Sequence, residues 1–372
     1  MGFQGHSSNC RRKCMFLLPL CFDCCVMRIN IILGLFLSCS FLGAFAQGER
    51  SDKGEAVTYE EIYDEPYGVN KLFIGFQPLY GEAFATNVNA GFGVEASYYY
   101  QDKADFKVHF RKPYSSGFFD LNNDLASKNA TTSTQPKGFS YLEFGGTYHF
   151  KDVEETSKTK MVLYKNSYKG NKWAGRVPLT AEVPAKVRKI YGARLGGIIW
   201  NTTADLNRVM EKQDLTYSDL VTTEGVGIPS TFIDDLGRTQ DVKVFSNLST
   251  AGLYVGSSIS WFRNIAVSFN NYEDAVDDGM LTLFFDILYS PALNVDPVQY
   301  MGTEYSVDAI KTNALGFRLG IDGKFNRTLS WSYGGELGYR PSFKGQSFFA
   351  MFKISFPVFG TNLDYKVESF GQ

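Results

Sequence analysis

Residues 315–340 contain two long stretches in which apolar and polar residues alternate, and this pattern limits the possible folds more than any other feature of the chain. Successive side chains of a strand point in opposite directions, so each stretch has one apolar face and one face of glycine and charged residues. Each stretch is about 11 residues long, which suits a tilted strand that crosses a bilayer and is roughly twice the usual globular length. The pattern therefore predicts a membrane-spanning β-hairpin. Its first apolar row is Leu315, Phe317, Leu319, Ile321 and Phe325.

The same alternation recurs upstream. Residues 90–100 and 105–111 alternate in this way and flank the polar turn Gln101-Asp102-Lys103-Ala104. The chain is therefore predicted to be all-β and to form an antiparallel transmembrane β-barrel over residues 71–359. We expect about twelve strands, within a range of ten to fourteen. Their predicted ranges are 71–79, 90–100, 105–111, 138–150, 159–166, 187–200, 250–262, 264–271, 280–289, 313–325, 328–340 and 347–358.

The connections between these strands differ in length. Those around Arg263 and Asn326 are short, and four others are long. Short periplasmic turns and long external loops are typical of membrane barrels. With twelve strands and both termini in the periplasm, however, residues 201–249 fall on the periplasmic side. The four long connections are 112–137, 167–186, 201–249 and 290–312.

Residues 201–249 are not featureless. Thr203 is a candidate cap for a short helix that presents Leu206, Val209 and Met210 on one side, and residues 231–236 could form another helix. This insertion is therefore interpreted either as a plug or constriction segment or as a structured surface loop.

The front of the chain has the pattern of an export signal. Arg28 is followed by an almost wholly apolar run, and Ala44-Phe45-Ala46 precedes Gln47, which predicts a signal peptide over 27–46 that is cleaved after Ala46. Residues 1–26 are interpreted as a start codon placed too early, or alternatively as an extension before an uncleaved anchor. An acidic segment over 47–70 leads into the barrel, and a tail over 360–372 follows it. All six cysteines precede Gln47, which disfavours a disulfide-bonded secreted domain.

The polar rows of the predicted strands contain many charges. Charges that face lipid at mid-depth cost about 2–4 kcal/mol for Arg or Lys, so these rows are expected to face the barrel interior. Two interpretations stay open, a salt-bridged structural core and a slightly cation-lined pore that favours anions. The predicted lumen-lining residues are Lys107, His109, Arg111, Glu143, Arg194, Arg318, Asp322, Lys324, Glu336 and Arg340.

Several functions are disfavoured by composition. The 37 basic and 39 acidic residues give no global attraction to nucleic acid. Only His109 and His149 follow the export signal, so no metal site, cofactor site or catalytic residue is predicted. A lipid hydrolase needs a serine and a histidine on the barrel, and no serine can be assigned to either histidine. This enzyme is the least favoured alternative.

The chain resembles bacterial outer-membrane β-barrel proteins in its alternating strands, its Ala44-Phe45-Ala46-Gln47 export site and its aromatic-rich final strand from Phe348 to Phe359. Its abundance of Tyr, Phe and Asn is most similar to those of the Bacteroidetes. One departure is that Gly360–Gln372 continues beyond the last aromatic strand.

This resemblance implies an outer-membrane location, with outer-membrane lipids and the barrel-assembly machinery as partners. The favoured function is a passive, porin-like channel or uptake protein for small solutes, without enzymatic activity. One alternative is a non-conducting scaffold or secretion-associated barrel. Another is an exported soluble β-sandwich or a lipocalin-like binding protein. The sequence does not indicate an oligomeric state.

Overall fold

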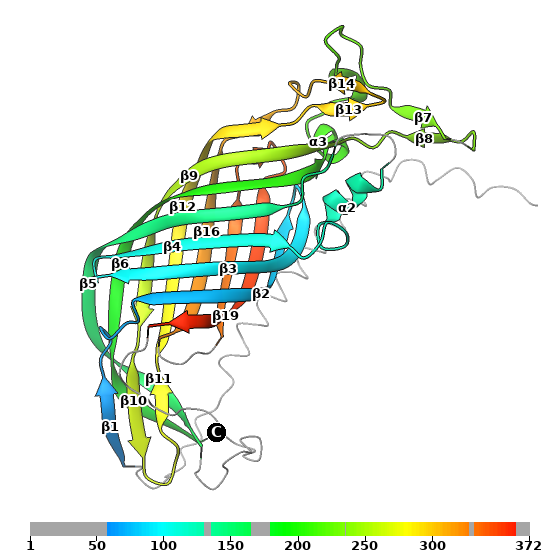
Figure 1. The fold of residues 1–372 in the computed structure, drawn as a ribbon. Coiled ribbons are helices and arrows are strands. Elements are labelled where there is room, and N and C mark those ends of the chain that lie inside the picture. The colour runs from blue at the N-terminus through cyan, green and yellow to red at the C-terminus, as the bar shows by residue number, and fades with distance from the viewer. Residues whose placement is uncertain (1–57, 130–134, 165–178, 235, 327–330, 362–372) are drawn as a thin grey trace, which may run out of the picture. The chain divides into compact units, whose positions relative to one another are not determined.

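The computed structural model describes residues 58–129, 135–164, 179–234, 236–326 and 331–361. Ten antiparallel strands close into a barrel, in the order β12-β16-β17-β19-β2-β3-β4-β5-β6-β9 (Figure 1). The predicted all-β antiparallel barrel is therefore confirmed. The expectations for residues 1–26 and 27–46, and nearly all of that for the tail, lie outside the described residues. The barrel strands are β2 (Leu72–Phe84), β3 (Val88–Tyr100), β4 (Ala104–Pro113), β5 (Ser140–Leu163), β6 (Leu179–Asp205), β9 (Phe245–Phe262), β12 (Gly279–Val295), β16 (Leu315–Phe325), β17 (Ser332–Tyr339) and β19 (Phe348–Gly360).

Closure joins the first and last strands of the barrel. Pairing of β19 with β2 runs from Phe349 opposite Phe84 to Gly360 opposite Phe73, with two irregularities in register. The hairpin predicted over residues 315–340 is formed by β16 and β17, which pair from Phe317 opposite Tyr339 to Gly323 opposite Tyr333. Strand β17 has 8 residues and is shorter than expected.

The two faces of the strands differ as alternation requires. Along β16, Leu315, Phe317 and Leu319 are exposed on the exterior, whereas Arg318 and Gly320 are buried. Neighbouring strands continue the exposed apolar row. Exterior residues of this kind include Phe76, Val94, Phe106, Val108, Leu142, Phe144, Leu195, Val255, Leu283, Phe285, Ile287, Leu337, Phe352 and Phe356.

The expected number of twelve strands was too high, for two reasons. The predicted strands 138–150 and 159–166 are parts of one strand, β5, which has 24 residues. The predicted strand 264–271 corresponds to β10 (Ile265–Phe269), which belongs to a separate three-stranded sheet and not to the barrel. Local sequence makes residues 159–166 and 264–271 look like separate barrel strands. Only the pairing of these segments with distant strands shows that the first continues β5 and that the second belongs to another sheet.

With ten strands in place of twelve, residues 201–249 lie at the other end of the barrel from the one expected. We call the end of the barrel where β2 begins and β19 ends the terminal end, and the opposite end the loop end. With β5 as a single strand, β6 reaches the loop end at Asp205 and β9 starts there at Phe245. The connection between them therefore lies at the loop end, together with the long connections after β4 and β12, and not at the terminal end.

Short elements lie at the loop end, where Figure 1 shows α2, α3, β7, β8, β13 and β14. Their apolar side chains pack on the barrel: Leu206, Val209 and Met210 of α3 form one buried cluster with Tyr80 and Trp200. None of the described helices is long and apolar enough to cross a membrane. The elements are α2 (Leu121–Ser127), α3 (Leu206–Lys212), the 3₁₀ helix η3 (Tyr217–Asp219), β7 (Thr231–Ile233), β8 (Thr239–Asp241), β13 (Val298–Tyr300), β14 (Thr303–Tyr305), β15 (Thr312–Asn313) and β18 (Ser342–Phe343).

The helix expected in residues 201–249 is present, but its cap differs. Asp205, and not Thr203, caps α3 by accepting a hydrogen bond from the backbone N–H of Asn207 (3.0 Å). Thr203 is instead the third-last residue of β6 and donates to the backbone oxygen of Lys137. The second expected helix, at 231–236, is wrong, because residues 231–233 form strand β7.

A second sheet lies at the terminal end (Figure 1). It consists of β1 (Tyr59–Asp64), β10 and β11 (Ala275–Asp277), so part of the acidic segment 47–70 is an ordered strand. Strands β5 and β6 continue past their barrel neighbours and pack against this sheet. The shared apolar cluster contains Met161, Leu163, Val183, Ala185, Ile265, Val267 and Phe269.

Asp120 forms hydrogen bonds that hold the loop between β4 and β5 against neighbouring segments. Its carboxylate is buried and accepts hydrogen bonds from Asn87 Nδ2 and the backbone N–H of Phe139, both at 2.7 Å. Burial raises the pKa of this carboxyl above its ordinary value. We expect Asp120→Ala to lower the free energy of opening this loop by about 1–3 kcal/mol, because two buried donors lose their acceptor. Trypsin cleavage after Lys128 and Lys137, followed by mass spectrometry, should become at least about fivefold faster.

Asp124→Ala is the control for this change. Asp124 lies in the same loop and pairs with exposed Lys128 at 2.6 Å, an interaction worth only about 0–1 kcal/mol. Equal cleavage of the two variants would contradict the role assigned to Asp120.

Candidate functional site

Eight of the ten residues predicted to line the lumen form three groups of ion pairs at different depths between the loop end and the terminal end. The other two lie outside these groups: His109 contacts Gln77, and Lys324 contacts Ser97. The groups are centred on Glu82, on Arg318 and on Asp322.

The group nearest the loop end joins β2 and β4 to the residue that follows β17. Glu82 accepts hydrogen bonds from Arg340 Nη1 (2.9 Å) and Nη2 (3.1 Å) and from Arg111 Nη1 (3.3 Å). The Arg111 guanidinium also lies over the ring of Tyr141, with 3.9 Å to its centroid. Glu82 and Arg111 have no exposed side-chain surface, so the ion pairs form away from solvent.

The middle group is centred on Arg318. Its guanidinium binds Glu143 of β5 (Nη2 to Oε1, 2.6 Å), Asp286 of β12 (Nε to Oδ2, 2.8 Å) and Glu336 of β17 (3.4 Å). Arg194 of β6 binds the second oxygen of Asp286 at 2.9 Å. Two arginines and three carboxylates thus form one connected network, which is how buried charges are kept at tolerable free-energy cost.

The third group lies toward the terminal end. Lys353 binds Glu95 (2.6 Å) and Asp322 (3.0 Å), and Lys107 forms a short contact with the other oxygen of Asp322. His109 lies between this group and the first, with Nε2 2.9 Å from Gln77 Oε1. Two of these ion pairs join residues that are far apart in the sequence, Lys107 with Asp322 (215 positions) and Lys353 with Glu95 (258 positions).

These contacts cross the lumen. Four strands separate β4 from β16 whichever way one follows the barrel, so the Lys107–Asp322 pair joins opposite walls. At least three strands separate β16 from β5, which the Arg318–Glu143 pair joins. Side chains fill much of the interior of a barrel of this size, and here charged pairs bridge it at two depths.

Glycines on the inner face make room for this packing. A Cβ atom on Gly256 would lie 2.1 Å from Asp286 Oδ1, and one on Gly320 would lie 2.2 Å from the ring of Phe284. The Phe284 ring in turn lies against the Arg194 guanidinium, at 4.2 Å. The glycines that the sequence placed in the polar rows therefore let large side chains lie across the lumen.

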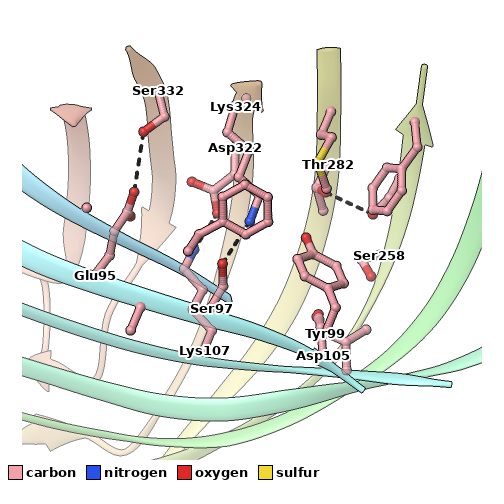
Figure 2. A pocket seen from close by; sticks show the side chains of 18 of the residues that line it. Glu95, Ser97, Tyr99, Asp105, Lys107, Ser258, Thr282, Asp322, Lys324 and Ser332 are labelled. Atoms are coloured by element: carbon pink, nitrogen blue, oxygen red, sulfur yellow. Dashed lines mark hydrogen bonds and ion pairs between the residues drawn. The ribbon is translucent and has the colours of Figure 1, made fainter. Parts of the chain in front are cut away.

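An interior cavity of about 100 Å³ remains below the third group, toward the terminal end. Figure 2 shows Lys324 and Ser97 pointing toward one another across it, and Lys324 Nζ donates to Ser97 Oγ at 2.8 Å. Ser258 and Thr282 line another wall, and Asp105 lies beside Tyr99. Four apolar side chains of the cavity lining form a cluster at its terminal end, and they are Phe73, Ile190, Phe262 and Met280.

Glu82 was not among the predicted lumen-lining residues, although it accepts hydrogen bonds from both arginines of the first group. The expected strand stopped at residue 79, whereas β2 continues to Phe84 through an irregularity between Gln77 and Tyr80. That irregularity shifts the alternation, so Gln77 and Tyr80, three residues apart, both face inward. Pro78 lies within this irregularity and is the one local signal of a break in the strand.

The two histidines have different partners. His109 is buried against Gln77, and His149 Nδ1 lies 3.0 Å from the backbone oxygen of Asp102. Across the part of the chain that the structure describes, no group of three or more His, Cys, Asp or Glu side chains is placed to hold a metal ion.

Fold and interior together define the class of protein as a closed ten-stranded antiparallel β-barrel with a charge-bridged interior. Comparison of the chain with protein-family models and with curated proteins finds no match.

Proposed function

We propose that the protein is an outer-membrane β-barrel that is closed to the passage of solutes, which corresponds to the non-conducting alternative of the sequence analysis. The exterior supports the membrane part of this proposal. Apolar side chains stand exposed on strand after strand, for example Leu195 at 64%, Val255 at 57% and Leu319 at 48%. A contiguous apolar surface of this kind marks contact with a membrane or another apolar partner. Outer-membrane lipids and the barrel-assembly machinery are the partners that this proposal implies.

The distribution of polarity also favours a membrane barrel over a soluble one. A lipocalin-like protein would bury apolar rows inside and expose charges. Here the middle of the barrel holds Arg318, Glu143 and Asp286, while apolar rows face outward. In lipid this arrangement removes the charges from hydrocarbon, whereas in water it leaves the apolar rows uncovered.

The ion pairs that cross the lumen are the observation that carries the functional part of the proposal. Ion pairs join opposite walls at Lys107–Asp322 and Arg318–Glu143, and the cluster around Trp200 and Leu206 packs over the loop end. A porin-like passage needs a continuous water-filled lumen. The geometry therefore favours a scaffold or secretion-associated role over passive uptake.

Two measurements on the purified full chain test this proposal. We expect unboiled protein from outer-membrane fractions to migrate differently on gels from boiled protein. In planar bilayers it should give no conductance above that of a protein-free membrane, while an open porin under the same conditions conducts. Identical migration, together with solubility in the absence of detergent, would overturn the membrane barrel. Stepwise conductance would overturn the closed interior.

A further inference from the structure

The interior cavity holds a lysine, Lys324, whose charge interacts with those of Glu95, Asp105 and Asp322 without direct contact to a carboxylate among the described residues. The other two Lys or Arg side chains of its lining are in ion pairs, Lys107 with Asp322 and Arg194 with Asp286. Among the described residues, Lys324 forms no ion pair. Its Nζ donates to Ser97 and lies over the rings of Phe73 (4.3 Å) and Tyr99 (4.8 Å). An ammonium group carries three donors, so Lys324 keeps donor capacity for a ligand.

A carboxylate in the same lining also lacks an ion pair. Asp105 is half-buried at the start of β4, beside Tyr99, and within the described ranges no Lys, Arg or His lies within 4.0 Å of its oxygens. Figure 2 shows Asp105 and Lys324 in separate parts of the cavity wall. The cavity lining thus contains one basic group, Lys324, and one acidic group, Asp105, that are free to contact a ligand at two different points.

The remaining lining limits the size and character of a ligand. One water needs about 10–15 Å³ of such volume, so 100 Å³ corresponds to about seven to ten water positions, or a similar number of non-hydrogen atoms. The apolar cluster of Phe73, Ile190, Phe262 and Met280 offers contact to a hydrocarbon group. The hydroxyls of Ser97, Ser258 and Thr282 offer further hydrogen bonds.

We propose that this cavity binds a small zwitterion with a hydrocarbon side chain, an α-amino acid of about the size of leucine. Its carboxylate binds Lys324 and Ser97, its ammonium group binds Asp105, and its side chain packs on the apolar cluster. A simple anion would bring no hydrogen-bond donor to Asp105, and a simple amine would bring no acceptor to Lys324. This inference goes beyond the proposed function, because a closed barrel needs no ligand.

Binding to the full chain in detergent tests the proposal, by isothermal titration with three compounds. Leucine carries both charges, 4-methylpentanoate lacks the amine, and 3-methylbutylamine lacks the carboxylate. We expect leucine to bind at least about tenfold more tightly than either of the others, since each loses a charge-assisted hydrogen bond. Lys324→Met and Asp105→Asn should each weaken leucine binding at least about tenfold.

Two further variants keep the test decisive. Met280→Trp leaves both charges in place and fills the cavity, so it should abolish binding, while Lys160→Met on the exposed part of β5 should leave it unchanged. Retained heat-dependent gel migration shows that each variant is folded. The proposal fails if the wild-type protein binds none of the three compounds. It also fails if Asp105→Asn binds 4-methylpentanoate and leucine equally well, which would indicate a site for anions alone.

Discussion

Arg318→Met is expected to destabilise the barrel by about 3–5 kcal/mol, because it removes the shared partner of three buried carboxylates. Glu143 and Glu336 lose the ion pair that the structure assigns to them, and Asp286 keeps only Arg194. The side chain of Arg318 is 1% exposed, so water cannot replace it without opening the lumen. Urea unfolding of the protein in lipid vesicles, followed by tryptophan fluorescence, measures the change.

Two comparisons separate the lost charge from lost packing. Arg318→Met combined with Glu143→Leu removes both members of the closest pair, and it should recover part of the loss. Arg208→Met removes an arginine that is 65% exposed and lies 3.6 Å from Asp205, so it should change stability by less than about 1 kcal/mol. Equal stability of Arg318→Met and the wild-type protein would contradict a structural role for the network.

Alternation was enough to predict the faces of the barrel strands. The range expected for the first strand of the hairpin, 313–325, differs from β16 by two residues, and Arg318 lies on the inner face and Leu319 on the outer. This succeeds because a strand has a fixed two-residue period, so one row of its side chains faces the lumen and the other faces outward. The inner set of residues follows from the same rule.

The pattern fails where a strand leaves the barrel. Residues 151–158 of β5 are polar except for Val153, and they extend past the last residue that pairs with β4, Tyr148. The sequence therefore reads as two strands with a gap. Conversely, β10 is apolar enough to resemble a barrel strand, yet it packs on the extended β5–β6 hairpin.

The sequence also did not predict which acidic residue pairs with which basic residue inside the barrel. Lys107 and Asp322 are 215 residues apart, and they meet only because closure places β4 opposite β16. The polar rows offered several acids for each base, and no local pattern selects among them. Whether the lumen is open or bridged by ion pairs depends on the same long-range pairing of strands, so the sequence left both interpretations open.

Leu319→Arg is expected to cost about 2–4 kcal/mol if the barrel lies in a bilayer, since it places a charge on the exterior near mid-depth. Leu319 lies opposite Phe285 on one neighbouring strand and Leu337 on the other, and all three side chains are exposed. The substitution therefore changes only the outer face of β16, although Leu319 is adjacent to the inward-facing Arg318 in the sequence. Urea unfolding in lipid vesicles and the fraction of heat-modifiable protein are the measurements.

Val162→Arg supplies the matched comparison. Val162 is apolar and 40% exposed, like Leu319, but it lies on the part of β5 that extends past the barrel. In a water-soluble protein both substitutions would fall at exposed positions and change stability by about 0.5 kcal/mol or less. In a membrane barrel only Leu319→Arg is costly, because only Leu319 meets hydrocarbon. A cost at Leu319 with none at Val162 thus distinguishes lipid from water as the solvent of the exterior, and equal tolerance of both would contradict the membrane proposal.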